Sequence, residues 1–516
     1  MNMNLDHELN LSLTPGVAGR LAKHSLLSEA APTRERVVST YFDTPDQRLR
    51  RERVVVGYRK SGSEWLSSVR RCGRPLHRQA KTAEWEAAAE PGELDFSHVE
   101  DESLRALLES LRDELQPAFT TSFTRSAWLL EPRDGVRIEL SLDRGWIEAA
   151  GRRQPICEVE LDLVAGGVAD LFSTAGKLQT ELRLHPEAAN KLQRGYQACI
   201  DAPRQAVKAL PIATDGQMST IAGFRTIALA CLRHLQSNEQ GVRESDSPEF
   251  VHQARVAIRR LRSAIRVWKP LLPADFVADF DPLWQALAGR LGDTRNWDVF
   301  ISETLPTLID RFPESPEVAR LADYAQRCCA MHRQAARQAL SSLDYSRLLL
   351  DFPASLLVLP EDPEQRLADF APRCLKKRAK QVRELAAEAM DGDAAARHRL
   401  RVAYKRLRYA LEFFAPLFSG EALRQYHLAA SELQEVLGRL NDLSVAAQLI
   451  GEALPEDQRG DLCCWLEQQS EALLPELGRM LDAFHQQPAP WKRAPSAHLD
   501  LSPTATSTSG ASQLAA

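Results

Sequence analysis

Apolar and polar residues alternate along several segments of the N-terminal part of the chain. In Cys157–Leu163 three carboxylates share one face and apolar residues occupy the other, and Arg137–Asp143 follows the same pattern. Glu8–Leu13 repeats the alternation with weaker polar residues. Because successive side chains of a strand point to opposite faces of a sheet, each segment predicts a strand with one apolar face and one polar face.

The polar faces of these strands have two interpretations. An antiparallel sheet that faces water carries polar residues at alternate positions, and this ordinary explanation stays open. The strands, however, combine dense carboxylates with isolated arginines such as Arg59 on another segment. Carboxylates bind divalent metal ions, and Arg and Lys bind phosphate oxygens. The mixture therefore favours a closed barrel with a charged interior.

The helical part of the chain contains one basic segment twice. His252–Arg266 reads HQARVAIRRLRSAIR, and 146 residues later His398–Glu412 reads HRLRVAYKRLRYALE. A constant offset across two segments indicates a duplicated unit. At helical spacing each copy places a histidine and several cations on one face. These two basic stripes consist of His252, Arg255, Arg259, Arg262 and Arg266, and of His398, Arg401, Lys405 and Arg408.

Like charges on one helix face repel one another. Each basic stripe therefore favours an extended anionic partner over an ordinary solvated face, and the duplication strengthens this interpretation. The periodicity changes from that of strands to that of helices near Pro203 and Pro211. Proline interrupts regular structure, so these residues mark the domain boundary. We predict a multidomain α+β chain: a barrel domain at 1–202, a linker at 203–217, a duplicated all-α helical bundle at 218–490 and a disordered, Ser/Thr/Ala/Pro-rich tail at 491–516.

Composition narrows the class of protein. The 516 residues carry a net charge of −5, and 44% are apolar, as in ordinary globular proteins. The acidic total argues against nucleic acid as the partner, as does the isolation of Trp268 and Tyr409 near the stripes. No apolar run reaches the roughly 20 residues of a membrane span, Met1–Ser12 lacks a signal-peptide pattern, and the nine cysteines show no zinc spacing. These features predict a cytoplasmic protein without membrane segments.

Several ordered motifs of the first domain resemble those of CYTH domains, which belong to the triphosphate tunnel metalloenzymes. The motifs are YFDTPD at Tyr41–Asp46, EWE at Glu84–Glu86, LDRG at Leu142–Gly145, CEVELDL at Cys157–Leu163 and KLQRGY at Lys191–Tyr196. The resemblance implies an eight-stranded antiparallel β-barrel. It also implies that the tunnel binds a triphosphate together with Mg²⁺ or Mn²⁺ and hydrolyses it.

The helical part resembles a CHAD domain, and the order of the two domains matches CYTH–CHAD proteins. Leu291–Val299, which reads LGDTRNWDV, is similar to the L-G-x-x-R-D-x-D-V element of that family, with Asn296 in place of an Asp. The resemblance implies that the helical domain binds inorganic polyphosphate. The residues of the two basic stripes are expected to contact it. An association with polyphosphate granules in the cytoplasm is a further hypothesis.

The CYTH resemblance also implies roles for individual residues. Glu8, Glu158 and Glu160 are the expected metal ligands. Glu84 and Glu86 are the expected catalytic residues, which would orient the attacking water or bind a second metal ion. The expected triphosphate-binding residues are Arg59, Arg70, Arg125, Lys191 and Arg194.

The sequence departs from the CYTH pattern at its first strand. The family motif E-x-E-x-K reads Glu8-Leu9-Asn10-Leu11-Ser12, and Gly57 stands where an Arg is expected. Each lost charged contact raises a reaction barrier by about 2.7–4 kcal/mol, or roughly 10²–10³ in rate. Two hypotheses stay open: an inorganic triphosphatase that also binds polyphosphate, and a polyphosphate-binding scaffold with a catalytically silent barrel.

Overall fold

A computed structural model describes residues 8–27, 31–61, 64–71, 83–90, 94–200, 203–391, 394–418 and 420–492. The chain divides into two compact units. The first consists of residues 1–213, 224–361 and 442–468, and the second of residues 214–223, 362–441 and 469–516. The first unit therefore joins the N-terminal domain to helices of the first sequence repeat.

The N-terminal domain is built on one antiparallel sheet of nine strands, in the order β5-β4-β3-β2-β6-β7-β8-β1-β9. The strands are β1 (Glu8–Ser12), β2 (Thr33–Asp43), β3 (Val54–Ser61), β4 (Glu64–Arg71), β5 (Ala83–Ala88), β6 (Gln116–Arg133), β7 (Val136–Ala149), β8 (Arg152–Ala165) and β9 (His185–Pro186). The predicted eight-stranded closed barrel is therefore wrong. Within the described residues the two outer strands do not pair with each other: β5 pairs with β4, and the two-residue β9 pairs with the outer edge of β1.

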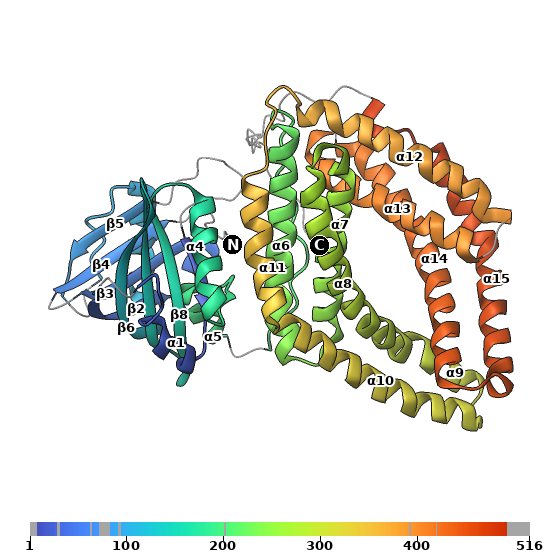
Figure 1. The fold of residues 1–516 in the computed structure, drawn as a ribbon, viewed down its shortest axis with the longest axis horizontal. Coiled ribbons are helices and arrows are strands. Elements are labelled where there is room, and N and C mark those ends of the chain that lie inside the picture. Colours follow the sequence, from blue (N-terminus) through green and yellow to red (C-terminus); the bar gives the residue numbers. More distant parts are fainter. Residues whose placement is uncertain are drawn as a thin grey trace, which may run out of the picture. The chain divides into compact units, whose positions relative to one another are not determined.

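The alternation seen in the sequence determines which face of the sheet is buried. Apolar residues of β1, β7 and β8 form one core with residues of α1 and α4, two helices that lie beside the sheet (Figure 1). The polar residues at the alternate positions are left on the opposite face. The buried strand residues include Leu9, Leu11, Ile138, Leu140, Val159 and Leu161. This apolar support fixes the strands that carry the carboxylates of CEVELDL.

Short helices connect and flank the sheet. They are α1 (Pro15–Leu21), α2 (Arg48–Glu52), α3 (Glu102–Leu111), α4 (Val168–Glu181) and α5 (Lys191–Ala198), with the 3₁₀ turn η1 (Arg112–Glu114). Asn190 caps α5 by accepting a hydrogen bond from the backbone N–H of Gln193 at 3.0 Å, which satisfies one of the free donors of the first turn. This cap places the first residue of α5, Lys191, over the polar face of the sheet, where it contacts the carboxylates of β7 and β8.

The remainder of the described chain is helical. Its α-helices are α6 (Thr220–Glu244), α7 (Pro248–Trp268), α8 (Ala274–Val299), α9 (Leu305–Arg311), α10 (Pro316–Leu340), α11 (Leu343–Leu357), α12 (Leu367–Asp391), α13 (Ala394–Phe414), α14 (Gly420–Ala453) and α15 (Glu456–Gln486). Short turns are η2 (Lys269–Leu271), the π-type η3 (Phe300–Thr304), η4 (Ala415–Leu417) and η5 (Pro490–Lys492). Among the described helices, none is long and apolar enough to cross a membrane.

Candidate functional site

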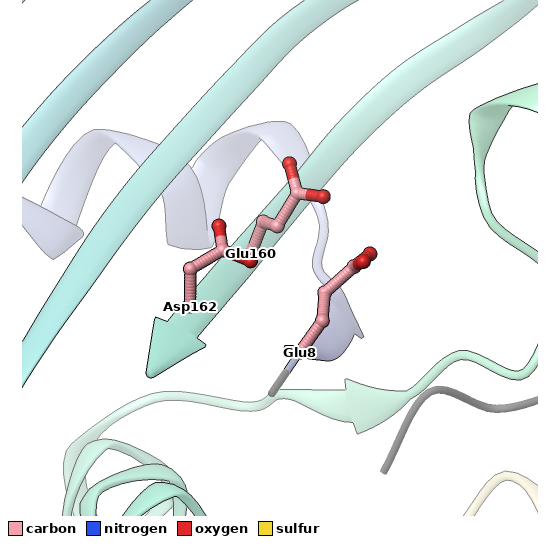
Figure 2. Close-up of side chains that lie close together, drawn as sticks. All are labelled: Glu8, Glu160 and Asp162. Atoms are coloured by element: carbon pink, nitrogen blue, oxygen red, sulfur yellow. The ribbon is translucent and has the colours of Figure 1, made fainter. Parts of the chain in front are cut away.

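Three carboxylates meet where β1 pairs with β8. The antiparallel register places Glu8 opposite Asp162 and Asn10 opposite Glu160. One carboxylate oxygen each of Glu8, Glu160 and Asp162 lies within 4.8 Å of the others (Figure 2). We call these three residues the carboxylate cluster. It arises because residues two apart on one strand share a face and the register aligns the two strands.

The carboxylates of this cluster repel one another in a partly buried setting. Burial and the neighbouring charge of Glu160 raise the pKa of Glu8, and burial with the charges of Glu160 and Glu8 raises the pKa of Asp162 to about 7. Burial alone would raise the pKa of Glu160 as well, but the charges of Lys191 and Arg125 lower it. A bound cation would remove the repulsion between Glu8 and Asp162.

Cations hold the other carboxylates of the same face. Arg125 of β6 donates two hydrogen bonds to Asp143, at 2.9 and 2.7 Å, and also contacts Glu160. Lys191 lies 2.8 Å from Asp143 and 2.5 Å from Glu158. The side chains of Asp143 and Glu158 are 0% and 1% exposed, and buried carboxylates require such partners.

These contacts change the pKa values of the two cations, Arg125 and Lys191. Burial alone would lower the pKa of Arg125, but its hydrogen bonds and attraction to Asp143 raise it above its usual value. Burial likewise opposes the charge of Lys191, and attraction to Glu158 and Glu160 raises its pKa. Both side chains are therefore positively charged at neutral pH.

A glycine allows α5 to approach the sheet. A Cβ built on Gly195 would lie 2.1 Å from the Phe119 ring, far inside van der Waals contact. The close approach brings Arg194 within reach of the sheet, where it donates a hydrogen bond to Glu158 at 2.8 Å. The Arg-Gly-Tyr part of the KLQRGY motif thus has a packing reason, since Tyr196 also packs against Phe119.

The polar face of the sheet also contains a cavity of about 160 Å³. Four of the five expected triphosphate-binding residues line it, together with Glu35, Ser39, Tyr41 and Thr121. These four are Arg59, Arg70, Arg125 and Lys191. The fifth, Arg194, is instead paired with Glu158. The structure therefore brings most of the predicted cations to one cavity, and two of them also contact the carboxylates.

Two groups of predicted residues have other surroundings than expected. Glu158 is not part of the carboxylate cluster, because Lys191 and Arg194 occupy its two oxygens. Asp162 takes its place in the cluster. The alternation of CEVELDL already placed Asp162 on the polar face, which was the only signal for it in the sequence. Glu84 lies on β5 and pairs with the cavity residue Arg70 at 3.2 Å.

Glu86, the other expected catalytic residue, lies opposite Ser68 in the β4–β5 register. Neither Glu84 nor Glu86 belongs to the carboxylate cluster or lines the cavity in the described part of the chain. A direct role for either residue in the reaction stays a prediction. Within the described residues, the ion pair with Arg70 connects Glu84 to the lining of the cavity.

The first basic stripe lies on α7, and all its members are half-buried. Arg255 donates to the backbone oxygen of Gly292 at 3.1 Å, and Arg262 donates to Asp281 at 3.0 Å. Burial, followed by the charge of Arg295, lowers the pKa of His252. The face of α7 that carries this stripe, including His252 and Arg259, therefore packs against α8, and part of its positive charge is neutralised there.

The second basic stripe lies on α13. His398 is exposed, whereas Arg401, Lys405 and Arg408 are half-buried. Arg408 pairs with Glu412 at 2.7 Å and lies over the ring of Tyr409, 4.7 Å from its centroid. The acid that pairs with Arg408 is on the same helix, whereas the acid that pairs with Arg262 of α7 lies on the next helix, α8.

The residues of the carboxylate cluster fit a divalent cation. Hard cations such as Mg²⁺ and Mn²⁺ prefer oxygen ligands, and the cluster offers three carboxylates. The side chain of Asn10 donates to Glu8 at 2.6 Å, and its own buried Oδ1 has no hydrogen-bond partner. Buried polar atoms without partners are rare, so Oδ1 is a fourth oxygen suited to a cation.

Comparisons with known proteins address both domains. The family model of the CYTH domain matches residues 11–196, and that of the CHAD domain matches residues 226–451. The chain is 29% identical over 196 residues to an inorganic triphosphatase of Haemophilus influenzae, which corresponds to 37% of this chain. The chain spans about half of that relative, namely 53% of its length.

Solved structures are similar to each part. The CHAD domain from the plant Ricinus communis is 32% identical, with a TM-score of 0.48, and the match covers 57% of this chain and 99% of that one. A Hippeastrum protein described as having a dominant triphosphatase activity is 14% identical, with a TM-score of 0.26. That match covers 38% of this chain and 98% of the other.

Proposed function

The chain joins a CYTH domain to a CHAD domain, and from this premise we propose that its N-terminal domain hydrolyses inorganic triphosphate with Mg²⁺ or Mn²⁺. We further propose that its helical domain binds inorganic polyphosphate. The observation that carries the first proposal is the cation-lined cavity that shares Arg125 and Lys191 with the surroundings of the carboxylate cluster.

In the proposed mechanism Glu8, Glu160 and Asp162 would hold the metal ion, with Asn10 Oδ1 as an additional oxygen ligand. When bound, a divalent cation neutralises phosphate charge and polarises the bond to be cleaved. Glu160 joins the two halves of the site, because it belongs to the carboxylate cluster and also contacts Arg125 and Lys191. A substrate between these groups therefore meets positive charge on one side and the metal site on the other.

The cavity residues bind and orient the triphosphate. Arg59, Arg70, Arg125 and Lys191 contact its non-bridging oxygens, and Arg favours bidentate phosphate contacts. Water then attacks the terminal phosphorus, the bond to the bridging oxygen breaks, and the products are phosphate and pyrophosphate. Phosphoryl transfer depends mainly on positioning and charge neutralisation. Glu84 orients the attacking water either directly or through Arg70.

The helical proposal rests on the two basic stripes. Polyphosphate carries about one negative charge per unit, so its binding releases counterions and weakens as salt increases, as for nucleic acids. Partners such as Asp281 hold Arg262 in place, which reduces the entropy that a long side chain loses on binding. A cytoplasmic location, with association to polyphosphate granules, follows as part of this proposal.

One experiment tests the enzymatic proposal. Phosphate release from inorganic triphosphate is measured with Mg²⁺ and with Mn²⁺ for the full chain, for Glu160→Gln and for Glu131→Gln. Glu131→Gln is the control, because it makes the same chemical change at an exposed position of β6. We expect metal-dependent release by the wild type and the Glu131 variant, and a loss of about 10²-fold or more in the Glu160 variant.

A second candidate function has its own supporting observation. Arg125 and Lys191, which the mechanism needs for phosphate, are already bound to buried carboxylates. If substrate cannot draw them away, the domain binds phosphate chains without cleaving them and the protein is a polyphosphate scaffold. Equal background release from all three proteins, together with retained polyphosphate binding, would support this candidate and reject the first.

A further inference from the structure

Helix α12 carries a third concentration of positive charge, separate from the two basic stripes. Six cations and no acid occur between residues 373 and 383: Arg373, Lys376, Lys377, Arg378, Lys380 and Arg383. All except Arg378 are exposed. The opposite side of the helix is buried through Leu375, Ala379 and Val382. We call the five exposed residues the α12 basic face.

The equivalent helix of the first repeat has none of these charges. With the offset of 146 residues, the six positions correspond to Ile227, Ala230, Cys231, Leu232, His234 and Ser237 of α6. Four of these residues are buried, and burial, followed by the charge of Arg260, lowers the pKa of His234. The duplication therefore produced one apolar copy of this surface and one cationic copy.

The contacts of α6 explain why its copy cannot be charged. Leu232 lines a small cavity together with Glu8 and Asn10 of β1. The imidazole Nε2 of His234 lies 3.0 Å from the backbone oxygen of Val207, in the segment that follows the N-terminal domain. An uncompensated charge in such surroundings would be costly. Five of the six corresponding positions of α12 are exposed, so charge is tolerated there.

The charge of the α12 basic face is nevertheless unfavourable for the helix itself. Arg373 and Lys377, and likewise Lys376 and Lys380, are four residues apart, and such like-charge pairs cost a few tenths of a kcal/mol each. One acid partly offsets this, because Glu384 lies 3.6 Å from Lys380. An anionic ligand that spans the face would remove the repulsion.

We propose that the α12 basic face is an additional binding surface for inorganic polyphosphate, contacted by the same extended chain that binds the stripe of α13. This inference rests on the proposed polyphosphate binding of the helical domain. Helices α12 and α13 pack side by side (Figure 1), so one chain can reach both. Residues 373 to 383 span about 15 Å along the helix axis, which accommodates several phosphate units.

The composition of the face favours polyphosphate over single-stranded nucleic acid. Three of its five cations are lysines, which contact phosphate as compact charges without a planar geometry. Nucleic-acid binders add aromatic side chains on which bases stack. The one aromatic residue of α12, Phe370, is engaged with Phe414 of α13 and lies outside the face.

The test uses the full chain with the triple variant Lys376→Gln, Lys377→Gln, Lys380→Gln. The matched control removes three exposed cations elsewhere: Lys23→Gln, Lys177→Gln, Arg327→Gln. Glutamine is a good helix former, so the fold is retained, which circular dichroism verifies. Affinity for polyphosphate of about 100 units and for a single-stranded RNA is measured as a function of salt, and triphosphate hydrolysis is measured in parallel.

We expect the triple variant to lose about tenfold or more in polyphosphate affinity at low salt, with hydrolysis unchanged. The slope of log affinity against log salt should fall by about 2, from roughly 0.7 per removed charge. An affinity and slope equal to those of the control would overturn the inference. Loss of RNA binding with unchanged polyphosphate binding would also overturn it, in favour of a nucleic-acid surface.

The same measurements separate this inference from the proposed function. If Arg401→Gln with Arg408→Gln weakens polyphosphate binding but the α12 variant does not, the α13 stripe stands and only the α12 surface is rejected. If the wild-type chain binds no polyphosphate at any salt concentration, both proposals fail together.

Discussion

At the scale of single residues, the exchange of Glu158 for Asp162 in the carboxylate cluster changes the expected chemistry of the site. Alternation along β8 placed both side chains on the polar face, but alternation gives the face and not the distance. Two facts outside the sequence pattern decide the outcome. Lys191 and Arg194 bind Glu158, and the register places Asp162 opposite Glu8.

Asp162→Asn should weaken binding of Mn²⁺ to the substrate-free chain by about tenfold or more, since changes even in outer-shell groups of metal sites typically cost 10–100-fold in metal affinity. Isothermal titration with Mn²⁺ measures this directly. Asp113→Asn, at an exposed position, is the control. A variant with unchanged Mn²⁺ affinity would show that Asp162 is not a ligand.

Asn10→Glu should have the opposite effect on the metal site. It restores the second carboxylate of the E-x-E-x-K motif, directly opposite Glu160. We expect tighter Mn²⁺ binding, together with a lower stability of the metal-free protein because a fourth carboxylate adds repulsion. Thermal unfolding with and without Mn²⁺ measures both effects. A variant less stable than the wild type even with saturating Mn²⁺ would contradict the prediction.

At the scale of secondary-structure elements, the strands and helices could be predicted from the periodicity of the sequence. Whether the sheet closes into a barrel could not. The two-residue β9 has no periodicity to read, yet it occupies the outer edge of β1. The basic stripes were also placed on helices correctly, as α7 and α13. Their partial neutralisation was not predictable, because Asp281 lies on another helix and contacts Arg262 only through tertiary packing.

His252 on α7 predicts a pH dependence for polyphosphate binding. Its pKa lies below the usual 6.5 because burial and the charges of Arg295, Arg259 and Arg255 outweigh the attraction of Glu249. The unfolded chain therefore takes up the proton first, and stability falls as pH decreases below about 6.5. A bound polyanion favours the protonated form, so polyphosphate affinity should increase as pH decreases through this range.

The variant His252→Gln should reduce this increase, measured as the ratio of polyphosphate affinities at pH 5.5 and 7.5. His427→Gln on α14 is the control for a histidine outside the stripes. Identical ratios in the wild type and in the His252 variant would show that this histidine does not take up a proton on binding. A salt series at each pH separates the proton effect from simple charge screening.

At the scale of the whole molecule, the sequence repeat and the compact units divide the chain differently. The duplication predicts two equal halves of the helical part. In the structure, most helices of the first repeat belong to the same compact unit as the N-terminal sheet. A buried polar cluster contributes to this grouping. Glu239 of α6 accepts hydrogen bonds from Tyr345 at 3.0 Å and Arg243 at 3.1 Å, and it contacts His185 of β9 at 2.5 Å.

This cluster connects three elements through nearly buried groups. The other imidazole nitrogen of His185 lies 2.8 Å from the hydroxyl of Ser346 on α11. β9 in turn pairs with β1, the strand that carries Glu8 and Asn10. Removing a hydrogen-bonding partner from a buried charged group typically costs about 1–3 kcal/mol. Such a loss should affect the coupling between sheet and helices as well as total stability.

His185→Leu should therefore lower the free energy of unfolding by about 1–3 kcal/mol and should increase hydrogen exchange in β1 more than in β6. The reason is that β1 depends on β9 for its outer pairing, whereas β6 lies in the middle of the sheet. Arg153→Ala, which breaks the exposed pair with Glu148, should cost no more than about 1 kcal/mol. Uniform exchange changes across the sheet, or equal costs for both variants, would show that the cluster does not link β1 to the helices.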